Sequence, residues 1–192
     1  MVFEEESCKV GKFAKARLSI VLCCSAPGEK LKLLVIGNAT RPRAFKQNNV
    51  TPDNLPVTWK HNKKAWMTTA VYEDRLNQLN ETMKKKRRII LFVDNATSHV
   101  VSKKLSNVHV KFLPPHLTSE LQPLNQGIIQ AMKDNYRKPM LHSLLAAVGK
   151  FITASEFAKS VTVFDAIRWI SSAWNNVREE TILGCSRRAG FA

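Results

Sequence analysis

Cysteine is scarce in this sequence, and its spacing excludes the common metal-binding patterns. The 192 residues include four cysteines, and none forms a C-x-x-C or C-x-x-H pair. Cys23 and Cys24 are adjacent within an expected strand, so their side chains should point to opposite faces, whereas Cys8 and Cys185 are isolated. We therefore predict free, buried thiols in a reducing compartment rather than a zinc site.

Long apolar runs are missing as well. No run approaches the ~20 residues of a membrane-spanning helix, so we predict no membrane segment. The glutamates within Met1–Glu6 argue against a secretory signal. The length suits one domain that buries roughly 70% of its unfolded surface, and no repeat, low-complexity stretch or linker divides it. We assign residues 1–192 to a single domain.

Carboxylates are outnumbered. Asp and Glu total 15 against 30 Lys and Arg, which gives a net charge of +15, and acidic residues become sparse after Glu81. A field of this sign favours a polyanion, and nucleic acid is the commonest one. The alternative is a surface that like charge keeps soluble. The composition therefore predicts a nucleic-acid partner and leaves the oligomeric state open.

Two groups of basic residues are candidate phosphate contacts. In the first, cations are interleaved with Phe45 and Trp59, which can grip a backbone and stack bases. We expect these two rings to be buried instead, where they pin a surface loop. The second group ends a predicted helix, where it fits a helix cap, a solvated face, a phosphate contact or a nuclear-import signal. The candidate residues are Arg41, Arg43, Lys46, Lys84, Lys85, Lys86, Arg87 and Arg88.

Strands and helices alternate in the N-terminal half, which predicts the α/β class. Residues 17–24 and 30–36 should form an antiparallel hairpin around Pro27-Gly28. A helix should begin at Thr68 or Thr69. Its apolar residues keep the helical period and should face the sheet: Tyr72, Leu76, Leu79 and Met83.

The C-terminal half is predicted to be helical. One helix should start at Pro123, after Ser119 and Gln122 at capping-box spacing, and Pro139 should kink or interrupt it. A second helix has Thr162 as its N-cap, and a last helical turn near 182–188 should end at Gly190. The second helix carries an apolar stripe that indicates core packing: Val163, Ile167, Ile170, Trp174 and Val177.

A carboxylate stands at the end of a buried strand in residues 87–99. Five consecutive apolar residues, 89–93, predict a strand covered on both faces, and Asp94 follows directly. Open α/β sheets place ligands and metals at such strand ends, although Asp is also common in turns. A further strand, 108–113, precedes Pro114-Pro115.

Residues 94–99, D-N-A-T-S-H, and 113–127, L-P-P-H-L-T-S-E-L-Q-P-L-N-Q-G, carry a resemblance. Together they resemble the DDE superfamily endonuclease domain of pogo and Tigger transposases, a group that includes jerky and centromere protein B. The resemblance assigns Asp94 to the second catalytic acid and Asn125, at the family's spacing, to the third, which is Asp in the family. Similar strings at 34–37, 62–67, 164–170 and 188–191 extend the resemblance from Gly11 to Phe191.

The resemblance implies a ribonuclease-H-like fold and two Mg²⁺ or Mn²⁺ ions held by three acids. The family's first acid lies on a strand upstream of the segment matched by Gly11, so we expect a domain truncated at that N-terminal strand. Asp94 would then be the one metal ligand in register, because Asn125 keeps a carbonyl oxygen but no charge. We expect Asp94 and Asn125 to converge at one end of the sheet. Without that first strand, strand 17–24 would lose the partner expected between it and the Asp94 strand. The sheet must then close this gap, leave an exposed edge or fill it with residues 1–10.

The sequence thus predicts a transposon-derived, nuclear, DNA-binding domain that resembles a DDE endonuclease and is catalytically inactive, with no metal bound productively. Two alternatives remain open. One is an active Mg²⁺-dependent endonuclease core whose first acid lies upstream of this chain. The other is a protein-interaction scaffold, which a flat salt dependence of DNA binding would indicate.

Overall fold

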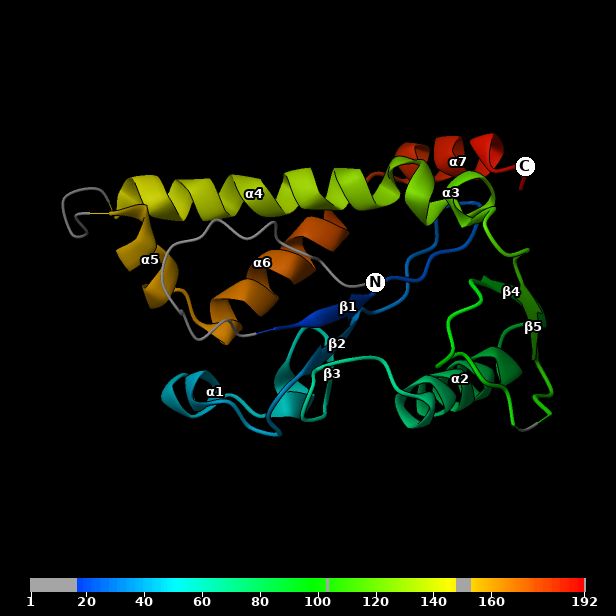
Figure 1. Ribbon diagram of the computed structural model, residues 1–192, viewed down its shortest axis with the longest axis horizontal. Coiled ribbons are helices and arrows are strands. Elements are labelled where there is room, and N and C mark those ends of the chain that lie inside the picture. The colour runs from blue at the N-terminus through cyan, green and yellow to red at the C-terminus, as the bar shows by residue number, and fades with distance from the viewer. Residues whose placement is uncertain (1–16, 103, 148–152, 192) are drawn as a thin grey trace.

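The computed structural model describes residues 17–102, 104–147 and 153–191 (Figure 1). It is a mixed α/β structure, which confirms the predicted class. A three-stranded sheet lies below the long helix α4 and the oblique helix α6 in Figure 1, and a two-stranded sheet lies to its right beside α2. None of the helices in the described ranges is long and apolar enough to cross a membrane.

The predicted hairpin is confirmed, although its strands are shorter than expected. Strand β1, Ser19–Val21, pairs antiparallel with β2, Leu34–Gly37, and an isolated bridge joins Cys24 to Lys30 nearer the turn. Strand β3, Thr58–His61, pairs parallel with β2 and was not predicted. Between β2 and β3 lie the short helix α1, Arg43–Gln47, and a 3₁₀ turn, Pro52–Asn54.

Helix α2, Thr69–Lys84, begins as predicted, with Thr68 as its N-cap. The four residues expected to face the sheet are all buried. Strands β4, Ile89–Val93, and β5, Val108–Phe112, follow it and pair parallel. Leu79 and Met83 of α2 pack with Val108, and Leu31, which lies between β1 and β2, packs on the same cluster. Helix α2 therefore contacts both sheets.

The two sheets are separate, and the prediction that β4 is covered on both faces is wrong. Alternate residues point to opposite faces of a strand, and Ile90 and Phe92 are 58% and 43% exposed. Phe191 contacts Phe92 with ring centroids 4.7 Å apart. Among the described residues, no strand pairs with the outer edge of β1 or the second edge of β4. Whether residues 1–10 fill the gap lies outside the described residues.

Six helical segments lie in the described part of the C-terminal half. They are α3, Thr118–Leu121; the π-helical turn η2, Leu124–Ile128; α4, Ile129–Ala146; α5, Ala154–Ser160; α6, Val163–Asn175; and α7, Glu179–Arg188. Thr162 caps α6 in a capping box, as predicted. Of the predicted apolar stripe, Ile167, Ile170, Trp174 and Val177 are buried and Val163 is half-buried against the same core, which confirms that the stripe packs in the core.

The predicted capping box before α4 is wrong, and of the two outcomes predicted at Pro139, interruption of α4 is wrong while a kink stays a prediction. Ser119 lies inside α3, where Leu117 occupies the N-cap, so the expected capping box is absent. Helix α4 continues through Pro139. A proline within a helix removes one backbone hydrogen bond, and Tyr136, three residues before Pro139, packs edge-on against Trp169 of α6.

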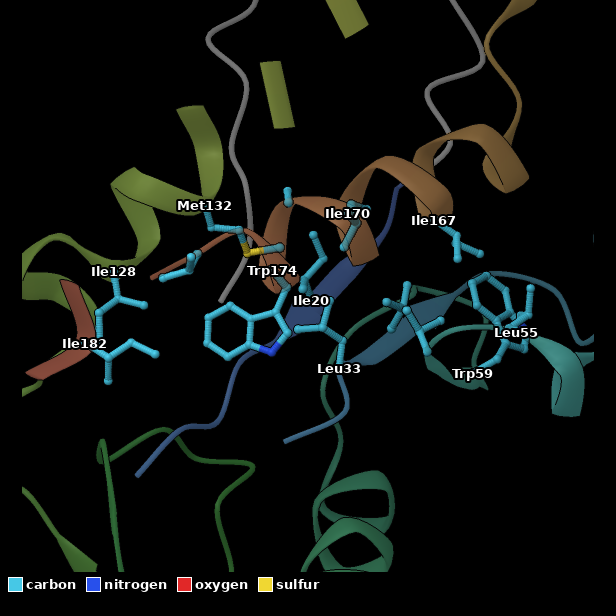
Figure 2. Close-up of a cluster of buried hydrophobic side chains, with 14 of the residues drawn as sticks. Ile20, Leu33, Leu55, Trp59, Ile128, Met132, Ile167, Ile170, Trp174 and Ile182 are labelled. Atoms are coloured by element: carbon cyan, nitrogen blue, oxygen red, sulfur yellow. The ribbon is translucent and has the colours of Figure 1, made fainter. Parts of the chain in front are cut away.

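The main core lies between the three-stranded sheet and helices α4 and α6. Figure 2 shows Trp174 of α6 among Ile20 of β1, Leu33 and Met132 of α4. The Trp174 indole N–H donates to the backbone oxygen of Leu31 at 3.0 Å. The Lys30 ammonium donates to the carbonyl oxygens of Trp174, Asn175 and Val177 at 3.2, 2.7 and 2.8 Å. The hairpin thus satisfies carbonyls at the C-terminal end of α6.

The cysteines of the described residues carry free thiols, as predicted. Cys185 is buried, whereas Cys23 and Cys24 are half-buried, so the expectation of burial holds fully for one of the three. Burial raises the pKa of Cys24 to about 12, so this thiol stays protonated and is a poor nucleophile. Cys8 lies outside the described residues.

Candidate functional site

Asp94 occupies the position that the sequence predicts, directly after β4. The backbone N–H of Leu113 donates to the Val93 oxygen at 2.8 Å, which marks the C-terminal edge of the β4–β5 pair. Beyond Asp94 the chain turns, and the His99 N–H donates to the Ala96 oxygen at 2.9 Å. The turn brings the His99 side chain back over the end of its own strand.

His99 is the direct partner of Asp94. Its Nδ1 lies 2.7 Å from the Asp94 carboxylate Oδ1 and 3.2 Å from the Asp94 backbone oxygen. The carboxylate contact is an ion pair when His99 is protonated. Interaction with His99 lowers the pKa of Asp94, and interaction with Asp94 raises the pKa of His99. His99 therefore positions the carboxylate of a candidate site residue.

Tyr72 of α2 closes the other side of this pair. Its ring stacks on the His99 imidazole, with centroids 4.5 Å apart and planes inclined by 26°. The Tyr72 hydroxyl is buried without a hydrogen-bond partner among the described residues. Burial and, to a smaller extent, the Asp94 charge raise the pKa of Tyr72 to about 12. The hydroxyl therefore remains a neutral donor beside the carboxylate.

Asn125 lies in the π-helical turn η2 rather than at the start of a regular helix, which corrects the predicted placement. Gly127, with φ of 132°, interrupts the helical path, and α4 begins only at Ile129. The Asn125 amide nitrogen donates to the Thr118 oxygen and to the Gln122 side-chain oxygen, each at 3.1 Å. The side chain is exposed, and its amide N–H groups donate to acceptors within the same segment of chain, residues 118–125.

Two side chains of helix α7 form hydrogen bonds to the turn η2. The Arg188 guanidinium donates to the Gln126 backbone oxygen at 2.7 Å, and the Cys185 thiol lies 3.3 Å from the same oxygen. Sequence reasoning missed both roles. The family-like string 188–191 was the one signal that pointed to this end of the chain.

Asp94 and the Asn125 turn follow neighbouring parallel strands, so both segments leave the same edge of the β4–β5 pair. Their side chains engage different partners, His99 for one and Thr118 with Gln122 for the other. Convergence of the Asp94 carboxylate and the Asn125 amide therefore stays a prediction.

The donor set does not fit a two-metal centre. Across residues 17–102, 104–147 and 153–191, no three side chains of His, Cys, Asp or Glu form a group that could hold a metal ion. A pair of hard divalent cations needs several anionic oxygens, whereas Asp94 is already paired with His99. The superfamily that this chain resembles generally uses divalent metals, and the described residues supply no such site.

The first basic group surrounds α1. Arg41, Arg43 and Lys46 are exposed, whereas the interleaved rings Phe45 and Trp59 are 0% and 9% exposed. The rings pack edge-on with centroids 5.1 Å apart. The prediction that they pin a surface loop rather than stack on bases is confirmed.

The second basic group follows α2 and is partly neutralised. Lys84 pairs with Glu81 at 2.6 Å, and Lys86 and Arg87 both pair with Glu29 of the hairpin turn. Lys85 and Arg88 are exposed and form no ion pair with a described residue. Phosphate contact by Lys85 and Arg88 stays a prediction, and these two cations are the members of the group that no described carboxylate neutralises.

Comparison with known proteins identifies the family. The family model for the DDE superfamily endonuclease matches residues 15–185. Tigger transposable element-derived protein 4 of Mus musculus is 36% identical over 98% of this chain and 36% of its own length. CENP-B homolog protein 2 of Schizosaccharomyces pombe is 36% identical over 92% of this chain and 36% of its own length.

Major centromere autoantigen B of Homo sapiens is 31% identical over 93% of this chain and 28% of its own length. The chain spans about a third of the length of these relatives. No solved structure matches it. The family model covers most of the chain, and the predicted resemblance is therefore confirmed: the chain belongs to the DDE superfamily endonuclease family, with Tigger transposable element-derived and CENP-B family proteins among its homologues.

Proposed function

We propose that this chain is the endonuclease-like domain of a transposon-derived nuclear protein, that it binds DNA, and that it does not cleave DNA. The observation that carries the proposal is the donor set at the C-terminal edge of β4. The Asp94 carboxylate is paired with His99, and Asn125 occupies the position at which the family has its third acid. One carboxylate cannot replace the charge that two divalent cations require.

DNA binding is supported by charge. The net charge of +15 attracts polyanions, and Lys85 and Arg88 are exposed cations without an ion-pair partner among the described residues. ARS-binding protein 1 of Schizosaccharomyces pombe, named for a binding activity, is 34% identical over 83% of this chain. We extend nucleic-acid binding to this chain on these two grounds, and with it the nuclear location.

The proposed core arrangement is ribonuclease-H-like. An antiparallel β1–β2 pair and a parallel β4–β5 pair both contact α2, as expected for parts of one such sheet. The Arg75 guanidinium of α2 donates to the Lys32 backbone oxygen at 2.7 Å, and Lys86 pairs with Glu29. These contacts join the hairpin to α2 and to the segment between α2 and β4.

A nicking assay tests the absence of cleavage. Supercoiled plasmid is incubated with the purified chain in Mg²⁺ or Mn²⁺, and we expect no relaxed or linear product. The control is Asp94→Ala, which should behave identically. Metal-dependent nicking that Asp94→Ala abolishes would overturn the proposal and favour the active endonuclease.

A salt titration tests DNA binding. Affinity for a duplex should fall by about 10³-fold or more between 50 and 200 mM salt if six or more phosphates are contacted. The double variant Lys85→Glu, Arg88→Glu should bind more weakly than Lys138→Glu, Arg168→Glu, which makes the same charge change on exposed residues of α4 and α6. A flat salt response would support the scaffold function instead.

A further inference from the structure

The connection between β3 and α2, residues 62–68, starts at the end of the three-stranded sheet where β2 and β3 end and β1 begins (Figure 1). Strands β2 and β3 are parallel and end there at Gly37 and His61. Strand β1 is antiparallel to β2, so Arg17, two residues before β1, lies at the same edge. Residues 62–67 belong to a family-like string to which the proposed function gives no role.

This connection is a built turn. The Asn62 side-chain oxygen accepts from the N–H groups of Lys64 and Trp66 at 3.2 and 3.1 Å, and its amide nitrogen donates to the Trp66 oxygen at 2.6 Å. Ala65 has φ of 53°, which a residue with a β-carbon rarely adopts, yet it is 0% exposed. The Ser19 hydroxyl donates to the Ala65 oxygen at 2.6 Å. Neighbouring structure therefore holds the turn in a strained conformation.

The result of this construction is an exposed indole between two cations. Trp66 is 46% exposed, whereas Trp59 and Trp174 are 9% and 2% exposed. The Arg17 guanidinium carbon lies 5.4 Å from the Trp66 ring centroid, and the Lys64 ammonium lies 5.9 Å from it. Lys63 beside them is exposed. An aromatic face next to cations is what proteins use to stack a base and contact its flanking phosphates.

We propose that Trp66, with Arg17 and Lys64, forms a stacking site for an unpaired nucleobase of a DNA strand. The inference rests on the proposed DNA binding and specifies the form of the ligand. Bases within a duplex are already stacked on one another, so an indole stacks readily only on a base that has left the stack or belongs to a single strand.

The site lies towards the candidate site residues. Trp66 stands three residues before α2, and Tyr72 in the first turns of α2 stacks on His99, the partner of Asp94. The N-terminal part of α2 therefore links the Trp66 turn to the Asp94–His99 pair.

Fluorescence anisotropy with labelled single-stranded oligo-dT and a duplex of equal length tests the inference. A lost base stack lowers affinity by about 5- to 150-fold, so Trp66→Leu should lose this much for oligo-dT and little for the duplex. Trp66→Phe should retain most of the oligo-dT affinity, because a stacking ring remains. Lys64→Met should lower the salt dependence, whereas Trp66→Leu should leave it unchanged. Thermal melting confirms that each variant is folded.

The outcomes separate the two proposals. If the unaltered chain binds neither oligo-dT nor duplex, the proposed DNA binding fails. If it binds both, and Trp66→Leu changes neither affinity or lowers both equally, the stacking site is refuted while DNA binding stands. If Trp66→Leu is not folded, failure of Trp66→Phe to retain oligo-dT affinity would also refute stacking. A parallel titration with oligo-rU decides whether the site prefers RNA, which would overturn its assignment to DNA.

Discussion

The indole of Trp59 occupies the space beside Gly37 that a side chain would need. A β-carbon on Gly37 would lie 2.2 Å from one ring carbon of Trp59 and 2.4 Å from another. The ring cannot move away easily, because Phe45 packs edge-on against it and its indole N–H donates to the Thr40 oxygen at 3.1 Å. Strands β2 and β3 can therefore pair in this register only with glycine at the end of β2.

Replacing Gly37 by alanine should destabilise the fold. The added methyl group overpacks a buried site, which costs about 1–3 kcal/mol of the free energy of unfolding. The matched control is Gly184→Ala in α7, where an added β-carbon meets nothing within 4 Å. This control should be neutral or stabilising by up to about 1 kcal/mol, because alanine favours helix. Equal denaturant midpoints for the two variants would contradict the packing described.

Lys30→Met should also lower the free energy of unfolding. The ammonium of Lys30 donates to three carbonyl oxygens at the end of α6, and methionine retains most of the side-chain volume without these donors. Because hydrogen bonds from a charged group contribute about 1.5–3 kcal/mol and this site is partly solvated, we expect a loss of about 2 kcal/mol. Lys32→Met, on an exposed neighbour, is the control in chemical denaturation. Similar losses of unfolding free energy for both variants would argue that the Lys30 hydrogen bonds to these carbonyls do not stabilise the fold.

Long periodic segments were predictable from sequence, because their burial repeats with the element itself. The hairpin and helices α2 and α6 are of this kind. The N-cap Thr162 was identified from its chemistry, and the start of α2 was narrowed to Thr68 or Thr69, of which Thr68 is the N-cap. Strand β3 was missed because T-W-K-H has one buried residue, Trp59, and no alternation of apolar side chains. Its strand conformation depends on pairing with β2, a contact distant in sequence.

The candidate site was predictable in part for the same reason. Asp94 follows a strand and belongs to a local motif, so its place could be inferred. Its environment could not, because Tyr72 comes from a different element and reaches His99 only through the packing of α2 on the sheet. The exposure of Ile90 could not be predicted either, since five consecutive apolar residues indicate burial but do not show which face of the strand is exposed to solvent.

The Asp94–His99 pair should make stability depend on pH with a maximum in mild acid. The raised pKa of His99 contributes stability that is fully present below its usual value of 6.5 and is lost as pH rises through the raised pKa. The lowered pKa of Asp94 contributes stability that is present above its usual value of 3.8 and is lost as pH falls through the lowered pKa. Both contributions describe one ion pair, so the gain is largest between these usual values.

The variant His99→Gln lacks this pair and is the reference for the measurement. Free energies of unfolding of the two proteins should differ most at about pH 5, and the difference should shrink as pH rises through the raised pKa of His99. An NMR titration of the His99 ring protons should give a pKa above 6.5. A difference that stays constant from pH 5 to 9 would show that His99 acts through packing on Tyr72 alone.

The two faces of β4 differ in exposure. Ile90 is 58% exposed, whereas the adjacent Leu91 packs on the cluster formed by α2 and β5. Ile90→Lys should therefore leave the melting temperature nearly unchanged and raise solubility, because a charge on an apolar strand next to a free edge hinders association between sheets. Leu91→Lys makes the same chemical change one residue along, but it buries a charge and should lower the melting temperature markedly. Thermal melting and sedimentation of the two variants provide the comparison. Equal destabilisation by both would mean that the strand is covered on both faces in solution, as the uninterrupted apolar run first predicted.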